Sequence, residues 1–141
     1  MASIAGTAQA AGQLVVEDAW IRTAPPGAAM RAGYAILRNT GDAPLVVRGA
    51  MSEAFGDVSI HATTIENGMA RMRELARIPL AAGESVTLEP GGKHLMLMRP
   101  VRELDPGAKA VIRFEIEGGS SAEAEFVVRD TAASADDHAH H

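Results

Sequence analysis

Histidine and methionine gather in one stretch of this 141-residue chain, between His61 and Met98. The stretch holds two of the five histidines and four of the seven methionines, and the other three histidines lie in the last four residues. Its donors follow the spacing H-x10-M-x21-H-x-M, through His61, Met72, His94 and Met96. Thioether together with imidazole, and without thiolate, is a donor set that favours Cu(I).

Strand geometry would bring the second half of this pattern together. The run from His94 to Met98 is predicted to be a strand, in which successive side chains point to opposite faces. His94, Met96 and Met98 then share one face, and Leu95 and Leu97 share the other, which we expect to be core. Donors two residues apart on a strand lie only about 6.5–7 Å apart, so both can reach one ion.

The first half of the pattern lies on two segments joined by the turn Glu66-Asn-Gly68. A hairpin turning near residue 67 places His61 and Met72 roughly opposite each other, with Cβ atoms about 5 Å apart. This spacing is compatible with a single site but does not require one. The alternative is that these methionines fill the core and the histidines make structural hydrogen bonds, which are the commoner roles of both residue types.

Composition excludes several other kinds of site. Because the chain has no cysteine, it has no disulfide, thiolate zinc site, iron–sulfur cluster or blue-copper centre. Zinc would prefer thiolate or carboxylate beside imidazole, and calcium and magnesium need oxygen ligands, whereas the candidate set contains no acid. The net charge of −5 argues against a nucleic-acid binder, and no stretch approaches the ~18 apolar residues of a membrane span.

The N-terminal residues do not settle the compartment. They lack the charged start and long apolar run of a signal peptide, although Ala8-Gln9-Ala10 resembles the end of one. A cytosolic start and a chain cut near a mature terminus are both open. We expect residues 1–13 to be a flexible segment, residues 14–130 to form one domain and residues 131–141 to be a disordered tail.

The pattern of the chain predicts an all-β fold. Gly and Pro interrupt short alternating segments every 8–12 residues, which is typical of a β-sandwich or Greek-key barrel, and no helix of ten residues is evident. We expect residues 28–31 and 52–56 to be irregular and 78–83 to be a break, and Trp20 to lie in the core. The expected strands are residues 14–21, 33–39, 44–51, 58–64, 69–75, 85–89, 94–98, 110–116 and 124–129.

The histidine and methionine pattern resembles that of the PCuAC family of periplasmic copper chaperones. The resemblance covers roughly residues 14–129 and includes segments beyond the four donors. One departure is Ala62, where a common variant of the family has methionine. The further matching segments are AWIR at 19–22, PPG at 25–27, YAILRNTG at 34–41, ENG at 66–68 and LEPGG at 88–92.

This resemblance implies a cupredoxin-like β-sandwich that binds one Cu(I) through His61, Met72, His94 and Met96 and passes it on. It implies a periplasmic, non-enzymatic metallochaperone that supplies copper toward a cytochrome c oxidase subunit, beside Sco-type thioredoxin-like proteins. We expect a monomer. Met69 and Met98 are lesser candidate donors, for which a packing role is the alternative.

The charged residues near the pattern and the C-terminal tail have weaker interpretations. Arg71, Arg73 and Arg77 could guide an acidic partner, but a solvated face explains them as well. The tail combines three histidines with two aspartates, a set that suits a second copper site for Cu(II). An ordinary solvated tail is the alternative. The tail histidines are His138, His140 and His141.

Two other functions remain open from the residues alone. A copper-dependent redox protein would need an open metal position and a nearby acid or base, and no such catalytic motif is recognisable. A β-sandwich interaction module, in which these side chains only pack, predicts that His61 and His94 are buried and far apart.

Overall fold

The computed structural model describes residues 12–25 and 27–129, and this part of the chain is built from strands, with no helix among these residues. Consequently, none of the described residues belongs to a helix long and apolar enough to cross a membrane. The strands are β1 (Leu14–Arg22), β2 (Met30–Asn39), β3 (Leu45–Met51), β4 (Phe55–Glu66), β5 (Met69–Glu74), β6 (Ile78–Leu80), β7 (Ser85–Leu88), β8 (Lys93–Pro100), β9 (Lys109–Ile116) and β10 (Ser121–Arg129).

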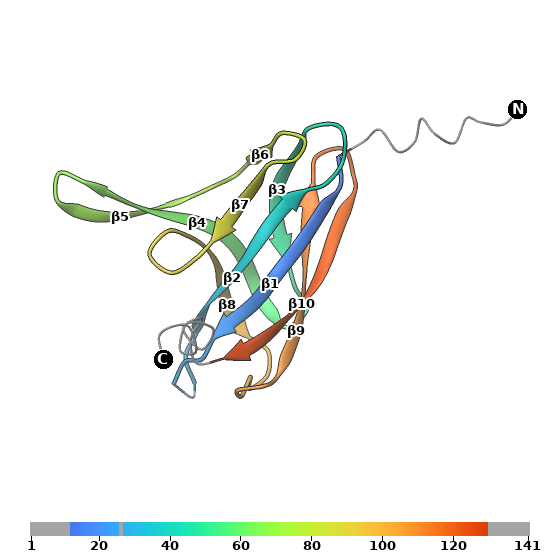
Figure 1. Cartoon of the computed structure of the whole chain (residues 1–141). Helices are drawn as coiled ribbons and strands as arrows, with labels where there is room; N and C mark the ends of the chain where they lie inside the picture. The colour runs from blue at the N-terminus through green and yellow to red at the C-terminus, as the bar shows by residue number, and fades with distance from the viewer. Residues whose placement is uncertain (1–11, 26, 130–141) are drawn as a thin grey trace, which may run out of the picture.

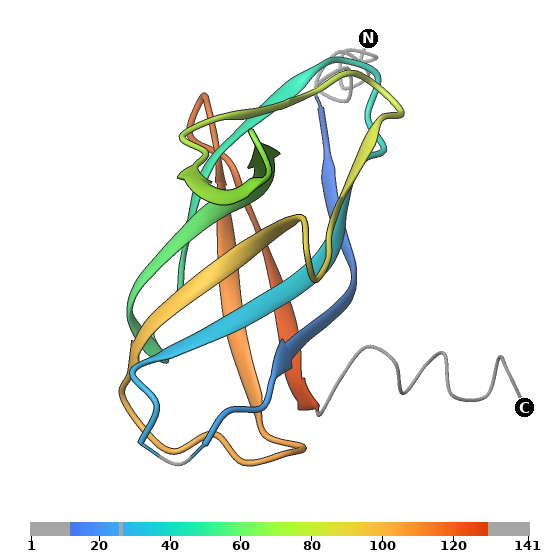
Figure 2. The same ribbon diagram turned by 90° about the vertical axis from the view of Figure 1, so that its left-hand side faces the viewer.

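The strands hydrogen-bond in the order β5-β4-β8-β2-β1-β10-β9-β3-β6, and β7 pairs with β2. The pairing of β1 with β10 is parallel, and the other strand pairs are antiparallel. The sheet folds over on itself, so that β4, β8 and β2 lie in front of β3, β9 and β10 in Figure 2. This arrangement confirms the predicted all-β Greek-key sandwich.

The core lies between these two layers and takes large side chains from both. Leu95 and Leu97 from the front layer, and Phe114 and Phe126 from the back layer, are fully buried in one apolar cluster. Trp20 is also buried, next to this cluster, and its ring contacts that of Tyr34 with centroids 4.8 Å apart and planes tilted by 38°. The expectation that Trp20 lies in the core is therefore confirmed, since its side chain is buried beside that of its neighbour Ile21.

Strand β8 shows the expected alternation. Leu95 and Leu97 are completely buried, whereas His94, Met96 and Met98 are half-buried on the opposite face. A register slip of one residue would exchange these two sets, so the buried leucines fix the face on which the histidine and methionines lie.

Strands β4 and β5 form a hairpin that projects from the sandwich, as Figure 1 shows. The turn consists of Asn67 and Gly68 between the paired residues Glu66 and Met69, and both turn residues have positive φ, 54° and 77°. Two positive φ values in a two-residue loop are those of a type I′ turn, whose twist matches paired strands. Strand β5 is exposed along its whole length.

Three segments expected to be irregular contribute to strands. Residues 28–31 contain the start of β2, since Met30 pairs with Met98. The expected break at 78–83 contains β6, which pairs with β3, and β4 already begins at Phe55, which pairs with Pro100. Each of these pairings joins residues far apart in the sequence, so the local composition does not reveal them.

The expectations for the chain ends concern residues that are almost all outside the described ranges. These are the flexible segment 1–13, of which only residues 12 and 13 are described, and the tail 131–141. The domain bounds 14–130 stay a prediction.

We predict that Leu95→Ala lowers the free energy of unfolding by about 3 kcal/mol, because it removes a fully buried side chain and leaves a cavity. Ile65→Ala is the control, since Ile65 is 70% exposed on the projecting hairpin and its truncation should cost less than about 0.5 kcal/mol. Urea denaturation followed by circular dichroism measures both. Equal losses in the two variants would contradict the layer assignment.

Candidate metal site

His61 and His94 lie directly opposite each other on the neighbouring strands β4 and β8. The Thr63 amide donates to the Gly92 carbonyl at 3.2 Å, which makes Thr63 and Gly92 a hydrogen-bonded pair. His61 and His94 come two steps further along the ladder and therefore form the same kind of pair, with Cα atoms about 5.5 Å apart. Their rings are nearly parallel, at 21°, with centroids 6.0 Å apart. Two imidazoles in this arrangement can reach a common ion.

Each imidazole has one nitrogen engaged by a neighbouring protein group. His94 Nδ1 lies 3.2 Å from the Gly92 carbonyl oxygen. A carbonyl can only accept, so this contact places the proton on Nδ1 and leaves an in-plane lone pair on Nε2. His61 Nε2 lies 2.9 Å from Ser59 Oγ, a hydroxyl that can either donate or accept.

The second nitrogen of His61 decides between these two possibilities. His61 Nδ1 is buried and has no hydrogen-bond partner within the described part of the chain. A buried N–H without an acceptor is rare and costly, so we assign the proton to Nε2, which donates it to Ser59 Oγ. His61 Nδ1 then carries a buried lone pair. Metal-binding histidines have this arrangement, in which one nitrogen donates to a protein group and the other faces the ion.

Met96 lies beside the histidine pair. It is two residues beyond His94 on the same face of β8, is half-buried, and is the cross-strand partner of Ser59. Same-face neighbours on a strand are about 6.5–7 Å apart. The Met96 thioether can therefore approach the same ion as the imidazole of His94.

Met72 occupies a different register from the one expected. Its cross-strand partner on β4 is Thr63, and the residue opposite His61 is Glu74. The expectation that His61 and Met72 lie opposite each other is wrong by two residues, because the turn is formed by Asn67 and Gly68, one residue later than that pairing requires. Met72 nevertheless lies on the same face as His61, since Thr63 and His61 are two residues apart on β4.

The register thus places all four predicted donors on one face of β5, β4 and β8. The histidine pair lies in the middle of this face. Met96 lies level with Ser59, two residues before His61 on β4, and Met72 lies level with Thr63, two residues after it. Met72 is 54% exposed, whereas the histidines and Met96 are half-buried. The interaction-module hypothesis predicted two buried, distant histidines, and the contact between the rings contradicts it.

Glu74 and Ser59 are neighbours of His61 that the sequence reasoning did not identify. The Asn67-Gly68 dipeptide is the signal that could have located Glu74, because a two-residue turn there pairs residue 61 with residue 74. Glu74 does not complete a group of hard or borderline ligands. The described residues contain no cluster of three or more histidine, aspartate or glutamate side chains that could hold a metal ion.

Met69 and the nearby arginines contribute little to this face. Met69 is an odd number of residues from Met72 and therefore faces the other side of the hairpin. Arg71 and Arg73 both pair with Glu66, at 3.4 and 3.2 Å. Arg77 pairs with Glu117 through two hydrogen bonds, of 2.9 and 3.0 Å. Because each of these exposed arginines has a carboxylate partner, the solvated-face interpretation fits better than a steering patch.

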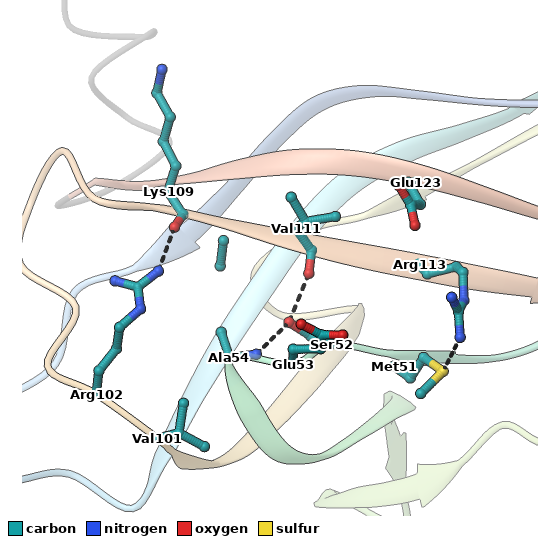
Figure 3. A pocket seen from close by; sticks show the side chains of 11 residues that line it. Met51, Ser52, Glu53, Ala54, Val101, Arg102, Lys109, Val111, Arg113 and Glu123 are labelled. Carbon is teal, nitrogen blue, oxygen red and sulfur yellow. Dashed lines mark hydrogen bonds between the residues drawn. The ribbon is translucent and has the colours of Figure 1, made fainter.

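A cavity of about 520 Å³ lies elsewhere, where the segment after β3 meets β9 and the residues after β8 (Figure 3). Two of its polar side chains are hydrogen-bonded: Ser52 Oγ donates to the Val111 carbonyl at 2.7 Å, and Arg102 donates to the Lys109 carbonyl at 2.9 Å. Its lining shares no residue with the four predicted donors. The lining residues are Met51, Ser52, Glu53, Ala54, Val101, Arg102, Lys109, Ala110, Val111, Arg113 and Glu123.

Sequence comparison relates the chain to a group of lipoprotein-like proteins. Residues 14–128 match the family described as "Putative lipoprotein LpqE-like". A relative from Leifsonia xyli subsp. xyli, "Putative lipoprotein Lxx21020", is 35% identical over 118 residues, which are 82% of this chain and 69% of the relative.

Solved structures share the fold. The solution structure of Cu(I)-DR1885 from Deinococcus radiodurans superposes with a TM-score of 0.66 at 26% identity, covering 90% of this chain and 87% of that one. The apo form of DR1885 gives a TM-score of 0.65 at 28% identity, with 94% and 91% covered. The apo PCuAC domain of PmoF2, at 24% identity and a TM-score of 0.68 over 86% and 94% of the chains, has the same fold. The predicted cupredoxin-like sandwich of PCuAC domains is therefore confirmed.

We predict opposite tautomers for the two neutral imidazoles: the proton on Nε2 in His61 and on Nδ1 in His94. Two-bond ¹H–¹⁵N correlation spectra distinguish the protonated from the unprotonated nitrogen of each ring. Ser59→Ala should weaken the preference of His61 for this tautomer and leave that of His94 unchanged, because only His61 contacts Ser59. A proton on Nδ1 of His61 in the unsubstituted protein would contradict the assignment.

Proposed function

This chain belongs to the LpqE-like family, and we propose that it is a metallochaperone that carries one Cu(I) ion at His61, Met72, His94 and Met96. Copper is the cargo in this proposal, and the chain has no catalytic role. The support comes from the donor chemistry of this chain, from the geometry of one face of β5, β4 and β8, and from the copper-binding proteins that share its fold.

The histidine pair is the observation that carries the proposal. The ring centroids of His61 and His94 are 6.0 Å apart. Nε2 of His61 is hydrogen-bonded to Ser59, and Nδ1 of His94 is hydrogen-bonded to the Gly92 carbonyl. The other nitrogen of each ring keeps a lone pair, and that of His61 is buried without a partner among the described residues. A purely structural histidine would be expected to use a buried nitrogen in a hydrogen bond.

The thioethers select the metal. Neutral sulfur donors suit Cu(I), whereas Zn²⁺ and Cu(II) prefer harder or charged ligands. Two imidazoles and two thioethers leave the ion with its charge of +1. The comparison proteins support the same choice, since DR1885 was solved with Cu(I) and the PCuAC domain of PmoF2 was solved with copper.

Delivery is the part of the function that we infer from the exposed hairpin. Met72 lies on β5, which is accessible along its length, so an approaching protein can contact this donor first. Substitution of Met72 by a ligand of the recipient would loosen the ion before the half-buried imidazoles release it. We propose a copper-receiving recipient outside the cytoplasm, in the periplasm: a cytochrome c oxidase subunit or a Sco-type thioredoxin-like protein. The PCuAC resemblance and the lipoprotein names of the relatives support this setting.

A second copper site in the tail is a separate part of the proposal. It would use His138, His140 and His141, which lie outside the described residues, and would bind Cu(II). Imidazole and carboxylate are donor types that suit Cu(II) better than Cu(I).

We predict that the protein binds one equivalent of Cu(I), and that His61→Ala and Met96→Leu each weaken this binding at least about tenfold, or 1.4 kcal/mol. Each substitution removes one of four donors. Titration against a chromophoric Cu(I) chelator measures stoichiometry and affinity in the same experiment.

Met69→Leu is the matched control for the methionine substitution. Met69 is exposed and faces away from the site, so the affinity should not change. Unaltered Cu(I) affinity in both His61→Ala and Met96→Leu would contradict the proposed site.

A further inference from the structure

Met30 and Met98 lie opposite each other where β2 pairs with β8. The Arg99 amide donates to the Ala29 carbonyl at 2.8 Å, so Ala29 and Arg99 form a hydrogen-bonded pair. The next pair along the ladder, Met30 with Met98, is then a non-hydrogen-bonded pair, with Cα atoms about 4.5 Å apart and the side chains closest. Two thioethers in this position can bind one ion between them.

Met96 links this pair to the histidines. It is two residues from Met98 on one side and two from His94 on the other, all on the same face of β8. Its cross-strand partner on β2 is Ala32, whose side chain is only a methyl group. Soft donors therefore run along β8 without interruption, from the histidine pair to the methionine pair.

Core packing does not account for these methionines. Met30 is 45% exposed, and Met96 and Met98 are half-buried on the outer face, whereas the core positions of β8 are filled by leucine. On its other side Met98 lies opposite Asp57, an exposed residue of β4. Thioethers do not neutralise a bound cation, so a nearby carboxylate favours its retention.

We propose that Met30, Met96 and Met98 form a second position for a soft monovalent metal, Cu(I), on the same face as the histidine pair. An all-thioether set discriminates against Zn²⁺ and Cu(II) more strongly than a mixed set does. The proposal rests on the proposed function in one respect: Met96 belongs to both positions. The ion moves between them by ligand exchange, in which bonds to His61, Met72 and His94 break as bonds to Met30 and Met98 form. Met96 stays bound, and copper stays Cu(I) throughout.

The test uses ¹³C-methyl-labelled methionine and Ag(I), a soft monovalent ion without accessible redox chemistry. In the His61→Ala/His94→Ala variant, Ag(I) should still bind, and it should shift the methyl resonances of Met30, Met96 and Met98. Adding Met30→Leu/Met98→Leu should weaken this residual binding at least tenfold. Methionine and leucine have similar volumes, so the fold should survive, which circular dichroism verifies.

The outcomes separate the two proposals. Residual Ag(I) binding that Met30→Leu/Met98→Leu leaves unchanged, or unshifted methyls of Met30 and Met98, would overturn the second position. The unsubstituted protein then shows whether the first position exists, because Ag(I) bound at that position should shift the methyl resonances of Met72 and Met96. Met51→Leu is the control, since Met51 lies on β3 beside the separate cavity, and its substitution should leave every Ag(I) affinity as it is.

Discussion

The alternation of side chains along β8 is the constraint on which the candidate site depends. Leu95 and Leu97 are completely buried in the core, so His94, Met96 and Met98 must lie on the outer face. A slip by one residue would bury an imidazole and two thioethers and expose two leucines. The energy of core formation therefore also positions the donors. The pairing of β8 with β4 on one side and β2 on the other brings further donors to the same face.

Part of this arrangement could be predicted from the sequence, because it is encoded locally. The run from His94 to Met98 has the period of a strand, and Asn67-Gly68 specifies a tight hairpin turn. The register of that hairpin was predicted incorrectly, since residue 61 pairs with Glu74 and not with Met72. Counting two turn residues from the Asn-Gly signal would have given the observed pairing.

Other features depend on pairings between distant segments and have no local signal. Met30 follows a segment rich in proline, glycine and alanine, and only its pairing with Met98 makes it part of a strand. The contact between His61 and His94 joins residues 33 positions apart in the sequence. The hydrogen bonds of Ser59 and Gly92 that orient these rings also need the folded backbone. The alternation along β8 could therefore be predicted from the sequence, whereas the partners that surround the two histidines could not.

The central claim concerns the donors around the cargo ion, and X-ray absorption at the copper K edge of the Cu(I)-loaded protein tests it most directly. We expect a first shell that contains both sulfur and nitrogen, because the proposed site combines two thioethers with two imidazoles. Since the chain has no cysteine, any sulfur in that shell must come from methionine. A first shell of nitrogen and oxygen alone would contradict the account.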